Sequence, residues 1–593
     1  MEYDLKIVNG LVYDGDGGEA QRADVAVRDG VIAAVGDCPG EAHEVIDAQG
    51  LIVTPGFIDL HTHYDGQVSW DANFQPSINH GVSTVVMGSC GVGFAPVRAA
   101  DREKLIRLME GVEDIPGIAL SEGITWEWET LPEYMDALDA KPHAIDFAVQ
   151  VTHDPLRVYV MGDRAVFNEQ AGPDDIAEMR RLTREAMEAG AIGFSTGRSD
   201  IHRSADGDWT PSSEATAEEL AGIAEALDGL DHGVLQAVND FDLEREGDAF
   251  DKEFDILEAM ARAGNGRPFS LSLMQRDFAP DQWKRIIERA EKAQAEGVDM
   301  RLQTAPRGIG VITGLQCTFH PFIGFPSYKG ICDLPLAERV ARMRDPDFKR
   351  QILSEQSEKL AGDGTPVPPI VDALMAAIDY VASKTFLLGE NPEYEQGPET
   401  SVLHMAEERG VGALEMIYDL LLEEEGRALL YFPIYNYTEM NFDNVYKMLT
   451  HPQAIMGLSD GGAHVGTICD SSFPTYLLTY WARDRQRGER LSLSEAIRRL
   501  TSDVADYCGM TDRGRIREGL KANINVIDME QLRLYAPRMV QELPAGGQRL
   551  LQDARGDRAV IVSGETVLTN EELTGHYPGR LYRSGQNSLS RAA

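Results

Sequence analysis

The chain has 593 residues, of which 43% are hydrophobic and 26% are charged, a composition typical of a globular protein that excludes collagen-like, mucin-like and disordered chains. Its 55 Lys and Arg residues against 97 Asp and Glu residues leave a formal net charge of −42. Such an acidic surface repels a phosphate backbone, so we expect no binding to nucleic acid.

The sequence also indicates where the protein acts. No stretch reaches the roughly 18 apolar residues of a membrane-spanning helix, and the segment MEYDLKIVNG has acidic residues where a signal peptide would carry positive charge before an apolar run. The six cysteines are scattered without a CxxC pair, which favours reduced thiols. We therefore expect a cytoplasmic protein without membrane contact. We also expect it to act on a small-molecule substrate and to form a homo-oligomer.

Both ends of the chain are rich in short β-strand patterns. Segments such as DLKIVNGLVYDG and ADVAVRDGVIAAVG combine β-branched residues with Asn-Gly and Asp-Gly turns, which is typical of hairpins. The same pattern returns only near the C-terminal end, in NINVIDME and RAVIVSGETVLT. These ends predict one small β-sandwich domain built from residues 1–54 and 515–593; the alternative is two unrelated β appendages.

The middle of the chain alternates apolar strands with amphipathic helices. The predicted strands are 55–63, 83–90, 145–153, 191–197, 234–240, 269–275, 300–306 and 454–460. Helical segments such as PDDIAEMRRLTREAMEAG lie between most of them. Because apolar strands joined by helices form parallel sheets, these eight units predict an α/β fold, a (β/α)₈ TIM-like barrel over 55–514. Its active residues should lie where the strands end.

A long segment, residues 310–445, separates the last two predicted strands. It is too long for a simple connection, and it contains both helical patterns and Pro-, Tyr- and Phe-rich stretches. We predict an inserted subdomain before the last barrel strand that acts as a lid over the strand ends. The aromatic run 431–437 is expected in the core of this insertion, and the acidic run 423–425 on its solvated surface.

Two histidines close the first predicted barrel strand. His61 and His63 follow the apolar segment PGFIDL and, as alternate residues of a strand, point to the same face. Two imidazoles on one side of a barrel mouth suit a borderline divalent ion such as Zn²⁺. The alternative is a pair of hydrogen-bonded structural histidines.

Two further residues end neighbouring strands. Cys90 closes the next strand, where a thiolate could complete or bridge a metal site; the alternative is a buried small hydrophobe. Asp460 closes the last strand in GLSDGGAH, where a carboxylate beside an activated water could act as general base; the alternative is a turn residue. His464 lies just beyond and is a candidate substrate contact.

These segments resemble the amidohydrolase superfamily, specifically its D-aminoacylase (N-acyl-D-amino-acid deacylase) branch. PGFIDLHTHYD, MGSCGVGFAP and GLSDGGAH are similar to the strand-one, cysteine and aspartate motifs of that branch, and AIGFSTG, VTHDPLRVYVMG and GRIREGLKANINVIDM match further segments. The resemblance implies zinc held by His61, His63 and Cys90, with Asp460 as the catalytic carboxylate.

The chain departs from this family at later strands. Relatives carry a zinc-binding histidine at the ends of strands five and six, where this chain has Asn239 and Met274 or Gln275. Asn and Gln amides are poor zinc ligands, so we favour one ion over two. His153 and His202 are candidates to rebuild the second site or to line the pocket.

At strand seven, a Tyr-Pro-Tyr segment of the family is replaced by QTAPR, residues 303–307. Arg307 in this segment and Arg198, which follows strand four, are candidates to hold an anionic substrate group in a bidentate clamp.

The sequence as a whole predicts a metal-dependent hydrolase of an amide-type C–N bond, most simply that of an N-acyl amino acid. In this hypothesis the metal activates water and Asp460 shuttles the proton. A metal-assisted lyase or decarboxylase, or a lactone hydrolase, on the same scaffold is the alternative within enzymes, because fold does not determine chemistry. A third reading is a catalytically inactive binding descendant.

Overall fold

Eight parallel strands form the centre of the molecule. The structure is a computed structural model that describes residues 2–241, 249–362 and 367–586. The strands are, in chain order, β6 (Phe57–Asp59), β7 (Val82–Met87), β8 (Asp146–Thr152), β9 (Gly193–Arg198), β10 (Val234–Asn239), β11 (Phe269–Ser272), β12 (Met300–Thr304) and β16 (Ala454–Met456). A parallel bridge between Thr62 and Gly461, just beyond β6 and β16, brings the two edge strands together. The predicted (β/α)₈ barrel is therefore confirmed.

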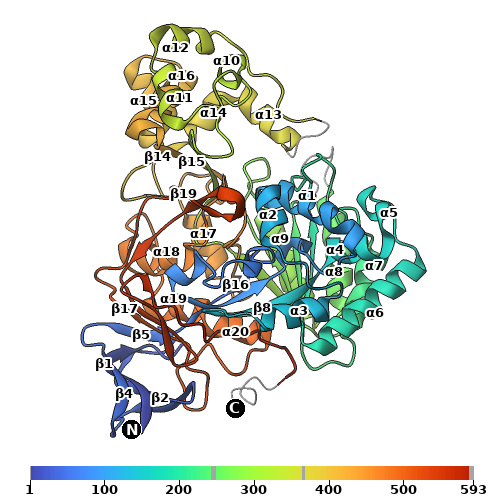
Figure 1. Ribbon diagram of the computed structural model, residues 1–593, viewed down its shortest axis with the longest axis vertical. Coiled ribbons are helices and arrows are strands. Elements are labelled where there is room, and N and C mark those ends of the chain that lie inside the picture. Colours follow the sequence, from blue (N-terminus) through green and yellow to red (C-terminus); the bar gives the residue numbers. More distant parts are fainter. Residues whose placement is uncertain (1, 242–248, 363–366, 587–593) are drawn as a thin grey trace.

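Helices cover the outside of this barrel (Figure 1). They are α1 (Arg102–Glu113), α2 (Gly117–Gly123), α3 (Leu131–Asp139), α4 (His153–Met161), α5 (Asp163–Val166), α6 (Pro173–Ala189), α7 (Ala217–Ala224), α8 (Phe250–Ala263), α9 (Gln282–Ala295), α17 (Asp443–Leu449), α18 (Phe473–Tyr476), α19 (Leu493–Leu500) and α20 (Ser502–Cys508).

Helix α6 shows why the sequence forms these helices. Pro173 occupies its first turn, and Gly190 ends it with a φ of 109°, a conformation that glycine adopts without strain. Its buried residues lie three or four positions apart, so one face packs on the barrel: Met179, Leu182, Thr183, Ala186 and Met187. Among the described residues, no helix has both the length and the apolar character needed to cross a membrane.

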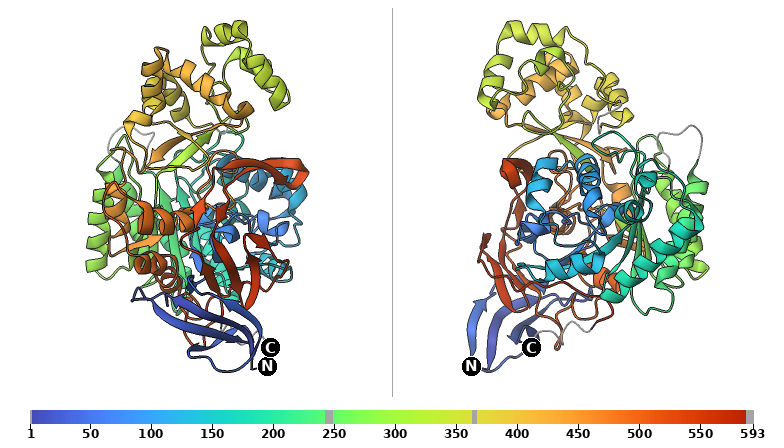
Figure 2. Two further views of the ribbon diagram at one scale, coloured as in Figure 1. Left: turned by 90° about the vertical axis from the view of Figure 1, so that its left-hand side faces the viewer. Right: turned by 45° about the vertical axis from the view of Figure 1, so that its right-hand side comes forward.

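Strands from both ends of the chain share a second sheet. Its N-terminal strands are β1 (Tyr3–Val12), β2 (Gln21–Arg28), β3 (Val31–Gly36), β4 (Ala42–Asp47) and β5 (Ile52–Pro55), and its C-terminal strands are β17 (Ile524–Ile527), β22 (Asp557–Val562), β23 (Glu565–Thr569) and β24 (Glu572–Leu573). The two groups join where β5 pairs antiparallel with β17. The small β domain built from both ends is thus confirmed, at the opposite end of the molecule from the insertion (Figures 1 and 2).

Part of the C-terminal segment leaves this sheet and packs on the barrel. The strand pairs β18 (Arg533–Leu534) with β21 (Ala554–Arg555) and β19 (Arg538–Leu543) with β20 (Gly547–Leu551) form separate ribbons. The backbone of Leu550 donates to the carbonyl of Val465, and that of Tyr582 to the carbonyl of Phe147 in β8. The boundaries at residues 54 and 515 remain a proposal, and residues 587–593 of that predicted domain lie outside the described residues.

The chain between β12 and β16 forms an inserted subdomain with its own hydrophobic core, as predicted. A three-stranded antiparallel sheet, β13 (Ile309–Thr313), β15 (Leu429–Tyr435) and β14 (Phe386–Leu388), joins it to the barrel. Its helices are α10 (Pro326–Lys329), α11 (Leu336–Met343), α12 (Pro346–Leu353), α13 (Pro369–Ala376), α14 (Ile378–Ser383), α15 (Val402–Arg409) and α16 (Ala413–Leu421). They stand above the barrel in Figure 1, and residues 363–366 lie outside the described residues.

Candidate metal centre

The motifs that end β6 and β16 lie side by side. The backbone N–H of Asp460 donates to the carbonyl of His61 at 3.1 Å, and the N–H of His63 donates to the carbonyl of Gly461 at 2.8 Å. Both imidazoles are 1% exposed. Two segments about 400 residues apart in the sequence therefore hold each other in register, and the predicted HxH pair faces the predicted aspartate.

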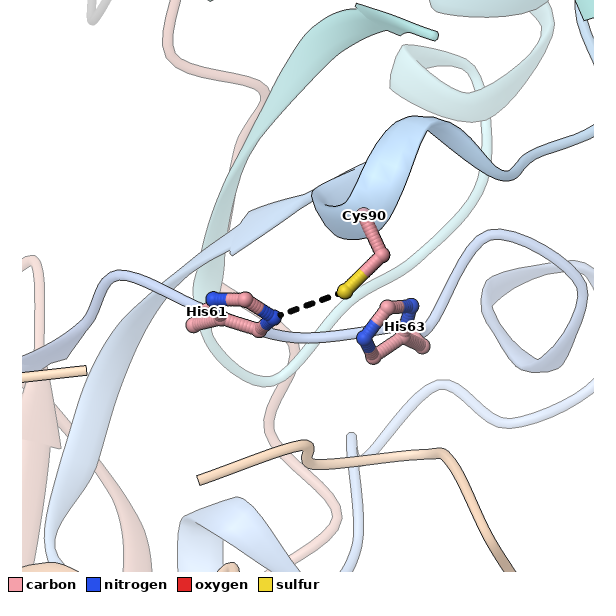
Figure 3. Close-up of side chains that lie close together, drawn as sticks. All are labelled: His61, His63 and Cys90. Atoms are coloured by element: carbon pink, nitrogen blue, oxygen red, sulfur yellow. Dashed lines mark hydrogen bonds between the residues drawn. The ribbon is translucent and has the colours of Figure 1, made fainter. Parts of the chain in front are cut away.

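Cys90 joins this pair from the end of β7. It lies in a short turn with a φ of 55°, and its Sγ is 3.3 Å from Nε2 of His61. Figure 3 shows the thiol between the two imidazoles. The backbone of Cys90 also lies close to β9. This requires glycine at position 197, because a Cβ there would lie 2.3 Å from the carbonyl oxygen of Cys90.

Asp460 completes the cluster. Its Oδ1 lies 3.3 Å from Nε2 of His61 and 3.5 Å from Nε2 of His63. The ligand atoms of His61, His63 and Cys90 all lie within 4.8 Å of one another. The structure thus brings together the four residues that the sequence predicted as metal ligands.

The surroundings of these residues fit a divalent ion. Neither ring nitrogen of the buried His63 makes a hydrogen bond of normal geometry within the described chain, which is unusual for a buried polar group. The Nδ1–H of His61 donates to Oε1 of Gln303 at 2.8 Å, an arrangement that leaves Nε2 as the free ligand atom. Two imidazoles, a thiol and a carboxylate form a donor set that suits Zn²⁺.

Burial and neighbouring charges set the protonation of these groups. Burial lowers the pKa of His61 to about 4, so its ring is neutral and Nε2 keeps its lone pair. Burial raises the pKa of the Cys90 thiol to about 11, so the thiol needs a cation beside it to ionise. Burial alone would raise the pKa of Asp460, but His63 and His61 hold it below its usual range, and the carboxylate is ionised.

Glu113, the last residue of α1, is a member of the site that the sequence analysis missed. It is fully buried, with Oε1 3.2 Å from Nδ1 of His63 and Oε2 3.5 Å from Nε2 of His464. Burial opposes protonation of His63 and is the largest single effect, but the Glu113 carboxylate, Asp460 and Cys90 together outweigh it and raise the pKa of His63 above its usual value. A signal was present in the sequence, because Ile106, Met109 and Glu113 follow at helical spacing on one buried face.

Two of the candidate substrate contacts lie at the site. His464 contacts Glu113 and, with His202, lines the cavity that opens from the candidate metal ligands. Burial lowers the pKa of His202 to about 3, and the nearby imidazoles of His464 and His63 add to this effect. Both rings are thus placed where a substrate would bind.

The structure places His153 and Arg198 outside the lining of this cavity. The ring nitrogens of His153 are bonded to Oγ1 of Thr196 at 2.8 Å and to Oε1 of Glu219 at 3.0 Å. Arg198 forms a two-point ion pair with Glu253, at 2.8 and 2.9 Å. Their hydrogen-bonding groups therefore bind other residues of the barrel and not the cavity.

Arg307 is also engaged elsewhere. It is 1% exposed, pairs with Oδ1 of Asp470 at 2.9 Å and stacks over the Tyr394 ring with a separation of 4.0 Å. It does not line the cavity. Neither arginine that we considered as a clamp for an anionic group therefore reaches the candidate substrate space.

A cavity of about 380 Å³ extends from the candidate metal ligands into the insertion. His61, Cys90 and Asp460 line one end, and residues of β13, β15 and α13 line the other. None of its described lining residues is Lys or Arg, whereas it carries the carboxyl groups of Glu110, Asp114, Asp240 and Asp460. The cavity is therefore continuous with the cluster of His61, Cys90 and Asp460. The charges of its described lining residues are unfavourable to a ligand with a free carboxylate.

The departures at strands five and six also lie in this cavity. Asn239, at the end of β10, lines it, but its Nδ2 donates to Glu253 at 3.3 Å and its Oδ1 accepts from the N–H of Phe241. Met274, just beyond β11, also lines it and is 7% exposed. The positions where relatives carry histidines therefore present an engaged amide and a thioether.

Comparisons with known proteins identify relatives that span nearly the whole chain. The family model described as the amidohydrolase family matches residues 44–568. D-aminoacylase of Alcaligenes xylosoxydans xylosoxydans is 26% identical over 585 residues, covering 98% of this chain and 97% of that protein. An uncharacterised protein of Mycobacterium tuberculosis is 29% identical over 647 residues, covering 100% of this chain and 98% of that protein.

Solved structures show the same fold. A structure from work on the binuclear metal centre of D-aminoacylase has a TM-score of 0.62 at 24% identity, covering 98% of this chain and 99% of that one. N-acyl-D-glutamate deacylase of Bordetella bronchiseptica, in complex with zinc and a phosphonate inhibitor, has a TM-score of 0.63 at 23% identity, covering 98% and 100%. The chain therefore belongs to the amidohydrolase family, in its D-aminoacylase-like branch, and is a metal-dependent hydrolase of carbon–nitrogen bonds other than peptide bonds.

Proposed function

We propose that the protein hydrolyses the amide bond of an N-acyl compound, with N-acyl amino acids as the first class to test, and that it uses one Zn²⁺ ion and Asp460 as proton shuttle. One observation carries this proposal: Nε2 of His61 lies 3.3 Å from both Sγ of Cys90 and Oδ1 of Asp460. Thiol, imidazole and carboxylate meet at one point of a cavity large enough for a small molecule.

The residues that would hold the ion are His61, His63 and Cys90, together with Asp460. A bound zinc ion would supply Lewis-acid chemistry, which polarises a substrate carbonyl and makes water more acidic. We favour one ion because the amide of Asn239 is already engaged and Met274 offers only a thioether in place of the second pair of histidines.

Asp460 performs the proton transfers in this proposal. Its carboxylate stays ionised although it is buried, because the two imidazoles offset the effect of burial on its pKa, and an ionised carboxylate can accept a proton from the attacking water. Oδ1 faces the imidazoles, which leaves Oδ2 to take this proton and return it to the leaving nitrogen. Glu113 holds His63 through Nδ1 and thereby directs Nε2 toward Asp460.

Asp460→Asn tests this mechanism. Asparagine keeps the shape and one oxygen but cannot accept the proton, so we expect kcat to fall about 10²- to 10⁴-fold while the zinc content stays near that of the wild type. The measurements are elemental analysis and steady-state kinetics on N-acyl-D-amino acids, lactones and carboxylated aromatic compounds. Asp484→Asn, at an exposed position, is the matched control.

Four outcomes would contradict the proposal. A wild-type kcat in Asp460→Asn would show that Asp460 is not the proton shuttle. Two zinc equivalents per chain would show that the site does not hold a single ion. Turnover of lactones or carboxylated aromatic compounds alone would favour the lactonase or lyase alternative. A chain that binds no zinc and turns over no substrate would be an inactive descendant.

A further inference from the structure

The inserted sheet turns one apolar face toward the catalytic cavity. In β13, the alternate residues Ile309, Val311 and Thr313 line it, and in β15 the alternate residues Leu430, Phe432 and Ile434 do so. Val311 pairs with Phe432, and Thr313 pairs with Leu430 across the two strands. The lining is therefore a continuous wall of paired side chains.

Helix α13 adds a second apolar surface to the same cavity. Val371, Leu374 and Met375 line it, and their spacing places them on one face of the helix. The sequence of α13, PIVDALMA, is strongly apolar, yet none of its residues is fully buried. Because apolar side chains gain free energy when they are removed from water, this face is suited to cover an apolar ligand.

The charges of the described lining residues further limit which ligands fit the cavity. The wall of β13 and β15 is continuous with the end that holds His61, Cys90 and Asp460, so a molecule reacting there can extend along it. Because none of the described lining residues is Lys or Arg, a carboxylate on the extending part would meet no Lys or Arg counter-charge among them. An uncharged hydrocarbon group fits both the shape and the chemistry.

We propose that the preferred substrate carries a long, uncharged hydrocarbon chain on its amide, and that this chain lies between the β13–β15 face and α13. This inference rests on the proposed amide hydrolysis. The hydrocarbon chain can belong to the acyl group or to the amine of the amide, because either would present the same apolar surface to the wall. The wall then acts as the specificity determinant of the enzyme.

A chain-length series tests this assignment on the zinc-loaded enzyme. N-acetyl-, N-butyryl-, N-hexanoyl- and N-octanoyl-glycinamide, which carry no carboxylate, vary the acyl side, and N-acetyl derivatives of butylamine, hexylamine and octylamine vary the amine side. Burial of a methylene is worth about fourfold, so kcat/KM should rise about fourfold per added methylene in one of the two series. Equal kcat/KM values along both series, with measurable hydrolysis, would overturn the inference and leave the proposed function intact.

Variants of the wall locate the effect. Ile434→Phe and Val311→Phe fill the cavity at half-buried positions away from the proposed metal ligands, so they should lower kcat/KM at least tenfold more for the octanoyl or octyl substrate than for the acetyl or butyl substrate. Leu387→Phe is the matched control, because it is half-buried in β14 of the same sheet but does not line the cavity. An equal loss for short and long substrates in the two wall variants would overturn the inference.

A binding measurement separates the two proposals. Octanamide should bind more tightly than butanamide in isothermal titration of the zinc-loaded wild type, and Ile434→Phe should abolish the difference. If octanamide binds in this way but no amide is hydrolysed, the apolar ligand site is supported and the proposed function is overturned. If the two amides bind equally, the ligand site is overturned whatever the activity.

Discussion

The barrel mouth has two halves that differ in chemistry. Where β6, β7 and β16 end, titratable groups crowd within hydrogen-bonding or ligand distance, among them His61, Cys90 and Asp460. Where β10 and β11 end, an engaged amide and a thioether replace such groups, and the insertion supplies aliphatic walls. The contrast teaches that the reactive residues of this fold come from short strand-end motifs, whereas the space for substrate depends on the inserted chain.

The largest effect is expected when a proposed metal ligand in the polar half is removed. His61→Ala should lose the ion and lower activity by more than about 10⁴-fold, beyond the range of one proton transfer, because both water activation and carbonyl polarisation depend on it. Elemental analysis and kinetics provide the measurement. His43→Ala, at an exposed position of the terminal sheet, should change neither. Full zinc occupancy in His61→Ala would show that the ligands lie elsewhere.

A smaller effect is expected from Glu113, which holds the polar half together without being one of the proposed ligands. Glu113→Gln removes the charge beside His63 and His464 but keeps the shape. Outer partners of metal-binding histidines contribute about 10- to 100-fold in metal affinity, so zinc binding should weaken by that factor in competition with a chelator. Glu103→Gln, on the exposed first turn of α1, should leave the affinity unchanged. An unchanged affinity in Glu113→Gln would contradict the role of Glu113.

The smallest effect concerns the stability of the insertion. Burial lowers the pKa of His320 to about 3, against 6.5 for a free histidine, and Arg339 adds to this effect. Between these values the unfolded state binds more protons, so stability rises with pH and is lost as pH falls from 6.5 toward 3. At about 1.4 kcal/mol per pH unit, the free energy of unfolding of the insertion should fall by about 2 kcal/mol from pH 6.5 to 5.

His320→Asn should flatten this pH dependence, since asparagine can still accept the hydrogen bond from the N–H of Phe322 but does not titrate. All six tryptophans lie outside 310–445, so circular dichroism follows the whole chain during urea unfolding, whereas tryptophan fluorescence follows the rest of the molecule. An unchanged pH dependence in the variant would show that other groups control the acid stability of the insertion.

Much of the fold was predictable because it depends on local patterns. Continuous apolar strands alternating with amphipathic helices have few packing solutions, and the eight predicted strands all appear in the barrel. The proposed ligands were predictable for a related reason. Strand-end residues of a parallel barrel point into one mouth, so HxH, Cys90 and Asp460 had to approach one another.

Other residues could not be assigned in this way. Arg198 and Arg307 occupy strand-end positions that suggest substrate contact, but buried carboxylates at Glu253 and Asp470 hold them away from the cavity. Helical spacing indicated that Glu113 is buried, but nothing in the sequence identified His63 as its partner. Pairing between residues far apart in sequence decides these cases, and no local pattern encodes it.

The sequence by itself determined the barrel, the insertion and the strand-end groups that meet in the metal centre, since strand periodicity and the parallel arrangement leave little freedom in where those side chains point. Only the tertiary structure decided which buried charges are paired and which face the cavity. It alone showed that Glu113 supports His63, and that one face of the inserted sheet lines the substrate space. The physical reason is that burial and ion pairing depend on the packing of distant segments, which acts after the local elements have formed.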